Sequence, residues 1–125
     1  MKNFVYIDEY GLLGSNFYWN NRGKTGATNE DLAAVGLVDD RVQVHKDIIP
    51  ILLKIDEVFQ QKRFRLYIKE GYRPKTLYEL VYEKRVERFG KEATDRLLNM
   101  KDMPHANGKT VDTAPWDPKE DRESI

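Results

Sequence analysis

The sequence predicts one α+β domain in which a small antiparallel sheet packs with helices. The chain has 125 residues, a length that fits a single domain spanning 1–125, and its 40% hydrophobic content is enough for a packed core. Apolar residues recur at helical spacing in some segments and alternate with a period of two in others. Several helices together with a few separated strands are typical of the α+β class.

The longest helical pattern lies between His45 and Lys62. Its apolar stripe consists of Ile48, Leu52, Ile55 and Phe59, with Ile49 and Leu53 beside it. Pro50 lies inside this stripe, and a proline in a helix interior clashes with the carbonyl group one turn earlier. We therefore expect the helix either to kink at Pro50 or to begin only a few residues before it.

A strand is predicted directly after this helix, from Phe64 to about Tyr72. Phe64, Leu66 and Ile68 alternate with Arg65, Tyr67 and Lys69. This period-two pattern is typical of a half-buried strand, and Gly71 and Pro74 are residues that end one.

Two further helices and a second strand are predicted after Pro74. Thr76 and Glu79 have the spacing of a capping box, which predicts a helix from there to about Phe89. Gly90 suits a left-handed C-terminal position, and a shorter helix is expected to end near Met100. Pro104 opens a loop, and the Thr- and Val-rich segment 110–114 is predicted to be the second strand.

The two ends of the chain lack a sustained period. Residues 1–30 place aromatic side chains among Gly and Asn, so we expect an irregular arm that wraps the core. Residues 117–125 are charged and aperiodic, and we expect a loose tail.

Composition and charge exclude several classes of function. Twenty-one basic residues balance twenty-one acidic ones, and no Lys/Arg run stands beside aromatic residues, so a nucleic-acid partner is not expected. No apolar run is long enough to cross a bilayer, and Lys2, Asp8 and Glu9 interrupt the first segment, so we expect a cytoplasmic protein. Because the chain has no cysteine, a metal ion would have to bind His, Asp or Glu.

Two motifs carry the candidate chemistry: Gly-Tyr-Arg-Pro at 71–74, where the first strand ends, and His-x-x-Gly-x-x-x-Asp at 105–112, which leads into the second. Their order and spacing resemble those of the zinc-dependent D-alanyl-D-alanine dipeptidases, which share the hedgehog/DD-peptidase fold. The resemblance covers most of the chain and is best from about residue 40 to 117.

The resemblance implies that His105 and Asp112 bind the catalytic Zn²⁺ and that Arg73 stabilises the oxyanion. Neutral imidazole and carboxylate are ligands that suit zinc, and a guanidinium group keeps its charge where negative charge develops. Gly108 is expected to let the chain turn between the two ligands. The implied function is a hydrolase, a zinc metallopeptidase of cell-wall (peptidoglycan) metabolism that cleaves D-Ala-D-Ala or a related short D-amino-acid peptide.

The chain departs from the family pattern in two places. Met103 and Pro104 precede the motif His where the family has small hydroxylic residues, which leaves the substrate preference open. The family also has a Glu and a third zinc-binding His three residues apart on a later strand, and no such pair follows Asp112 here. His45, which has no metal role in the family, is not a candidate to replace that ligand.

Several alternatives therefore stay open. The chain is a fragment of a longer protein, an inactive relative that binds a peptide or partner without cleavage, or a subunit whose site a second copy completes. A lost final strand would leave an open sheet edge, through which a homodimer could form. For the site residues, the alternatives are a structural His105–Asp112 pair and an ordinary salt bridge from Arg73 to a neighbouring carboxylate.

Overall fold

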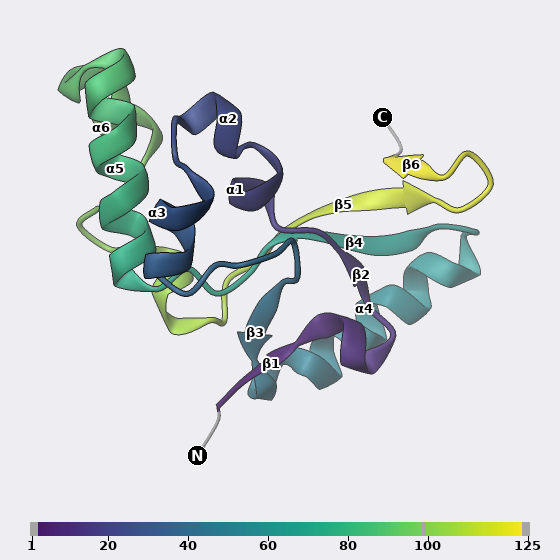
Figure 1. The fold of residues 1–125 in the computed structure, drawn as a ribbon. Coiled ribbons are helices and arrows are strands. Elements are labelled where there is room, and N and C mark those ends of the chain that lie inside the picture. The colour runs from purple at the N-terminus through teal and green to yellow at the C-terminus, as the bar shows by residue number, and fades with distance from the viewer. Residues whose placement is uncertain (1–2, 99, 124–125) are drawn as a thin grey trace.

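The computed structural model describes residues 3–98 and 100–123, which form a mixture of helices and strands with small sheets packed against helices (Figure 1). The first half contains β1 (Phe4–Tyr6), the 3₁₀ turn η1 (Ile7–Tyr10), β2 (Leu13–Gly14), α1 (Phe17–Asn20), α2 (Arg22–Thr25), α3 (Asn29–Ala34), β3 (Gln43–His45), η2 (Lys46–Ile48) and α4 (Ile49–Gln61). The second half contains β4 (Arg65–Glu70), α5 (Lys75–Phe89), α6 (Lys91–Leu97), η3 (Pro104–Asn107), β5 (Asp112–Asp117) and β6 (Arg122–Glu123).

The strands form two sheets. β1 and β3 make a two-stranded antiparallel ribbon, and the larger sheet has the order β2-β4-β5-β6. β4 pairs antiparallel with β5, and β5 with β6, but β2 pairs parallel with β4. The predicted small antiparallel sheet is therefore found in β4, β5 and β6, and the two-residue strand β2, which shows no period in the sequence, adds to its edge in parallel.

Two apolar cores lie on either side of the segment that follows β4. The first packs α4 against β3 and β4, and its buried residues are Ile7, Leu12, Val42, Val44, Ile49, Leu52, Leu66 and Ile68. The second lies among the short helices, α5 and the end of α6, with Tyr18, Ala27, Leu32, Leu77, Val81 and Leu98 buried. Figure 1 shows α5 and α6 together at one end of the molecule and the β5–β6 hairpin at the other.

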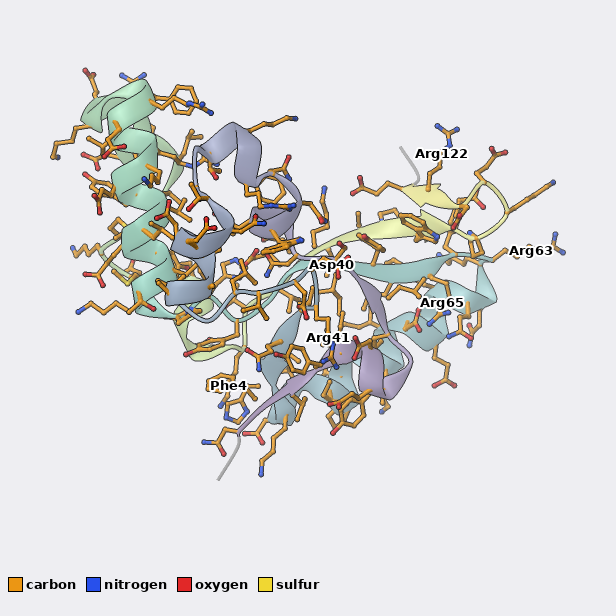
Figure 2. All side chains as sticks on the ribbon, viewed as in Figure 1. Phe4, Asp40, Arg41, Arg63, Arg65 and Arg122 are labelled. Atoms are coloured by element: carbon orange, nitrogen blue, oxygen red, sulfur yellow. The ribbon has the colours of Figure 1, made fainter. Side chains whose placement is uncertain are left out.

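Helix α4 begins at Ile49, so Pro50 lies in its first turn, where a proline is tolerated. One of the two predicted arrangements is thereby confirmed. Inside the helix, the buried Asp56 carboxylate accepts hydrogen bonds from the Leu66 N–H at 2.8 Å and from Arg65 Nη2 at 2.8 Å. Figure 2 shows Arg65 on the side of β4 that faces α4, whereas Arg63 and Arg122 project away from the molecule.

The ends of α5 differ in detail from the prediction. The helix begins at Lys75 with Pro74 as its N-cap and no side-chain cap, so the predicted Thr76/Glu79 capping box is wrong. A capping box does occur at α3, between Thr28 and Asp31. Gly90 has a φ of 88° and a ψ of 161°, an extended conformation with positive φ rather than the left-handed helical one, and α6 follows it directly as predicted.

The two chain ends are more ordered than the sequence indicated. Residues 3–30 contain β1, β2, α1, α2 and the start of α3, and they bury Ile7, Leu12 and Tyr18, so they are not an irregular arm. The second strand runs over Asp112–Asp117 rather than 110–114. Pro115 lies opposite Leu66 of β4, and β6 pairs only with the residues after Pro115, so the missing N–H of the proline leaves no gap in the β5–β6 ladder. Of the predicted loose tail, residues 122–123 form β6, and residues 124–125 lie outside the described part.

No helix in the described part of the chain is long and apolar enough to cross a membrane.

Candidate functional site

Arg73 lies in the short segment between β4 and α5, where the two cores meet. Its backbone N–H donates a hydrogen bond to the carbonyl of His105 at 3.0 Å, which ties the two sequence motifs together. Gly71 is required here because a Cβ atom at this position would lie 2.3 Å from the Gln43 carbonyl oxygen. The segment that contains Gly71 crosses β3 closely, and this contact fixes the backbone position of Arg73.

Arg73 is 7% exposed, and its guanidinium group lies against two tyrosine rings. Its guanidinium carbon is 4.7 Å from the ring centre of Tyr18 and 4.5 Å from that of Tyr78. Both contacts are favourable cation–π interactions, and two rings hold a planar guanidinium in one orientation. Burial raises the pKa of the Tyr18 hydroxyl, although the charge of Arg73 lowers it, so Tyr18 stays neutral.

The carboxyl group of Glu70 lies beside the Arg73 guanidinium group. Its Oε1 lies 3.6 Å from Arg73 Nε, and the Glu70 residue is only 1% exposed. Neither carboxyl oxygen of Glu70, nor Arg73 Nε, has a hydrogen-bond partner among the described residues. Burial raises the pKa of the Glu70 carboxyl to about 8, the charge of Arg73 opposes that rise, and Asp112 adds to it.

A β-bulge explains why a charged residue lies here. Leu66 and Ile68 point into the α4 core, and strict alternation would send Glu70 after them. The register between β4 and β5 shifts between Ile68, which pairs with Thr113, and Glu70, which pairs with Asp112, so Lys69 is the extra residue of the bulge. Such a bulge re-aims side chains, and here Lys69 and Glu70 line the same cavity.

His105 is held by hydrogen bonds on both its backbone and its ring. Its backbone N–H donates to the Tyr78 hydroxyl at 2.8 Å, and its Nδ1 lies 2.9 Å from the Gly71 carbonyl oxygen. Because a carbonyl oxygen only accepts, Nδ1 carries the hydrogen and the lone pair of the neutral ring is on Nε2. Nε2 is 3.5 Å from Asp112 Oδ2, so the free lone pair and the carboxylate lie side by side.

Asp112 begins β5 and its side chain is 61% exposed, unlike that of His105. The turn between the two residues contains Gly108 at a φ of 75°, where a Cβ atom would lie 2.6 Å from the Phe4 ring. The predicted role of Gly108 in this turn is confirmed, and the contact with Phe4 places the turn against β1.

The His105–Asp112 pair fits a zinc ion. Zinc binds imidazole nitrogen and carboxylate oxygen at about 2.0–2.2 Å, so a tetrahedral site needs about 3.3 Å between two ligand atoms. The observed 3.5 Å agrees with that requirement. The Nδ1–H bond to a carbonyl is also the support that metal-binding histidines normally have. Within residues 3–98 and 100–123, no third His, Cys, Asp or Glu joins this pair as a ligand group.

Two cavities meet at these residues and share Tyr18, Arg73 and Asp112 as walls. The bulge cavity, of about 320 Å³, is completed by Phe17, Lys69, Glu70 and Thr113. The loop cavity, of about 270 Å³, is completed by Tyr78, Leu97, Leu98, Pro104 and His105. A ligand that spans both cavities would pass Arg73 and Asp112.

The structure brings Arg73, His105 and Asp112 together, as the motifs suggest. Sequence reasoning missed Glu70, Tyr18 and Tyr78. Glu70 did leave a signal, since it is a charged residue in the apolar phase of a predicted strand. His45 lies apart from the site, with its ring against Phe4 and its Nδ1 accepting from the Asp47 N–H.

Comparison with known proteins adds no assignment to this geometry. No protein-family model matches the sequence, and no curated protein matches it significantly.

Proposed function

We propose that this chain is a zinc-dependent peptidase that hydrolyses D-Ala-D-Ala or a related short cell-wall peptide. The observation that supports the proposal most directly is the His105–Asp112 pair, 3.5 Å apart, beside a cavity wall formed by Arg73. These are the residues that the resemblance to the D-Ala-D-Ala dipeptidases selects. Each has surroundings that suit the role expected of it.

His105 and Asp112 would hold the ion. The Gly71 carbonyl fixes the ring of His105 so that Nε2 faces Asp112, and little ligand motion is needed on binding. Zinc, when bound, would act as a Lewis acid and lower the pKa of a coordinated water towards about 7. A third ligand and a general base would come from further residues of a longer protein or from a second copy of the chain.

Arg73 would face the peptide carbonyl oxygen as negative charge develops on it. The guanidinium group cannot lose its proton, and its 7% exposure means that little water screens its charge. Its orientation is set in advance by Tyr18 and Tyr78. Preorganised charge of this kind is worth about 100- to 1000-fold in turnover at comparable sites.

Zinc binding is tested first, by calorimetric titration of the metal-stripped protein. We expect one ion per chain and a loss of binding in His105→Ala. His45→Ala is the matched control, because it removes the other histidine of the chain without touching the site. Equal zinc binding by the wild type and His105→Ala would overturn the proposed site.

Turnover is tested next, by amine release from D-Ala-D-Ala in the presence of zinc. Arg73→Ala should bind zinc normally and lose about 100-fold or more of the activity. Undiminished hydrolysis by Arg73→Ala would remove its assigned role. Zinc-dependent peptide binding without turnover by the wild type would instead favour an inactive relative that binds peptides.

A further inference from the structure

The bulge cavity and the loop cavity offer different chemistry to the two sides of a bound peptide. The loop cavity adds Leu97, Leu98 and Pro104 to the shared walls, an apolar surface of which Leu97 is 69% exposed. The bulge cavity instead adds Lys69 and Glu70, two residues with ionisable side chains. A peptide bond held near Arg73 and Asp112 therefore has an apolar surface on one side and a charged one on the other.

Lys69 is the more accessible of the two cations that line the bulge cavity, because its side chain is 39% exposed whereas Arg73 is buried. Arg73 lies beside the buried Glu70 at 3.6 Å, and Asp112 lies beside His105 at 3.5 Å. Lys69 finds no partner among the residues that line this cavity and pairs instead with Glu123 of β6, at 2.9 Å. Glu123 reaches Lys69 from a neighbouring cavity, which the two residues share.

The Lys69–Glu123 pair is exchangeable. The side chains are 39% and 42% exposed, and ion pairs at such positions contribute only about 0–1 kcal/mol. A carboxylate on a ligand can therefore replace that of Glu123 at little cost. In the free protein, Glu123 occupies the position that a ligand carboxylate would take.

The sizes of the cavities limit the ligand. The bulge cavity, at about 320 Å³, lies at the lower end of the range for small-molecule sites, and the loop cavity, at about 270 Å³, lies just below that range. Each has room for one amino-acid residue rather than for an extended chain.

We infer that the site selects short peptides that present a carboxylate to Lys69 on one side of the cleaved bond and an apolar side chain to Leu97 and Pro104 on the other. This inference rests on the proposed function, because the peptide's position is set by Arg73 and the zinc pair. The carboxylate has two possible sources, the peptide's own C-terminus or an acidic side chain.

Two pairs of dipeptides separate these sources. Ala-Ala against Ala-Ala-amide tests the terminal carboxylate, and Ala-Glu-amide against Ala-Gln-amide tests the side chain. Each peptide is made from racemic residues so that stereochemistry does not decide the result. Affinities are measured by calorimetry with the zinc-loaded protein, and again after the metal has been removed.

In the wild type, the carboxylate member of at least one pair should bind about fivefold to tenfold more tightly than its amide. Lys69→Gln should abolish this preference, and Glu123→Gln should increase it, because the internal competitor is gone. Lys91→Gln is the matched control, since Lys91 forms a similar exposed pair with Asp95 on α6, outside both cavities.

The apolar side is tested by Leu97→Ser. This variant should weaken all four peptides alike, by about threefold, and leave the ratio of carboxylate to amide unchanged. An unchanged affinity in Leu97→Ser would overturn this half of the inference.

The outcomes separate the inference from the proposed function. Zinc-dependent binding of all four peptides with equal affinity, or a preference that survives in Lys69→Gln, would overturn the inference alone. If none of the four peptides binds in a zinc-dependent way, the proposed function and the inference are both overturned.

Discussion

Replacing Glu70 by Gln should stabilise the protein at neutral pH, and more so as the pH rises. Burial raises the pKa of Glu70 from 4.5 to about 8 despite the nearby charge of Arg73. Between those pH values, the unfolded chain releases a proton that the folded chain keeps. The free energy of unfolding of the wild type must then fall as the pH rises through this window and level off above it.

The magnitude follows from the width of the window. Each pH unit inside it costs about 1.4 kcal/mol, so the wild type should lose about 3 kcal/mol between pH 4.5 and pH 7 through this one group. Gln has the same shape and no charge to lose, so Glu70→Gln should lack that part of the pH dependence. A difference of this size corresponds to about 10 °C in Tm for a domain of 125 residues.

The assay is urea unfolding at the two pH values, followed by the fluorescence of the two tryptophans, in EDTA so that metal does not contribute. Glu92→Gln is the control, because it makes the same Glu-to-Gln change at a side chain that is 87% exposed. The reasoning is refuted if Glu70→Gln is the less stable protein at pH 7 and the gap closes on acidification. That result would mean that Glu70 is ionised and stabilised by Arg73.

Three further substitutions test the scaffold of the site. Gly71→Ala places a methyl group on a backbone oxygen of β3 and should cost about 3 kcal/mol or more in urea unfolding, with zinc binding weakened in parallel; a neutral effect would contradict the close crossing. Asp56→Asn leaves Arg65 without its ionised partner and should cost about 2 kcal/mol at pH 7. The pKa of Asp56 is lowered because its hydrogen bonds outweigh the effect of burial, so this difference should shrink as the pH falls below 3.8, and a pH-independent difference would count against the pairing. Thr28→Ala removes the capping box of α3 and should lower Tm by a few degrees, equivalent to about 1 kcal/mol, without changing zinc affinity.

The sequence predicts the helices and strands in which the hydrophobic pattern continues over many residues. Helix α4 and strand β4 are predicted because each buries one face in a core, although Ile55 of the predicted α4 stripe is exposed and Asp56 is buried instead. Helices α1 to α3, with four to six residues each, are too short to show a period. Strand β2 has two residues and forms only because β4 is already there to pair with it.

The same distinction applies to the site. Arg73, His105 and Asp112 lie in compact motifs, so their spacing along the chain is informative. Tyr18 reaches Arg73 from a helix that is remote in sequence, and such a contact leaves no local pattern. Glu70 is intermediate, since its buried position was predictable but the bulge that turns it towards Asp112 was not.

The three-residue strand β3 acts as a spacer between the two halves of the site. On one side of it, the Gln43 carbonyl accepts from the Tyr72 N–H, and on the other the His45 N–H donates to the Gly108 carbonyl. Only Val44 separates those two attachment points. The backbone of β3 therefore sets the distance between the segment that carries Arg73 and the loop that carries His105, although no side chain of β3 belongs to the site. Ligand binding should therefore slow the exchange of these amide hydrogens with solvent. Opening of the β1–β3 ribbon should release both halves of the site together.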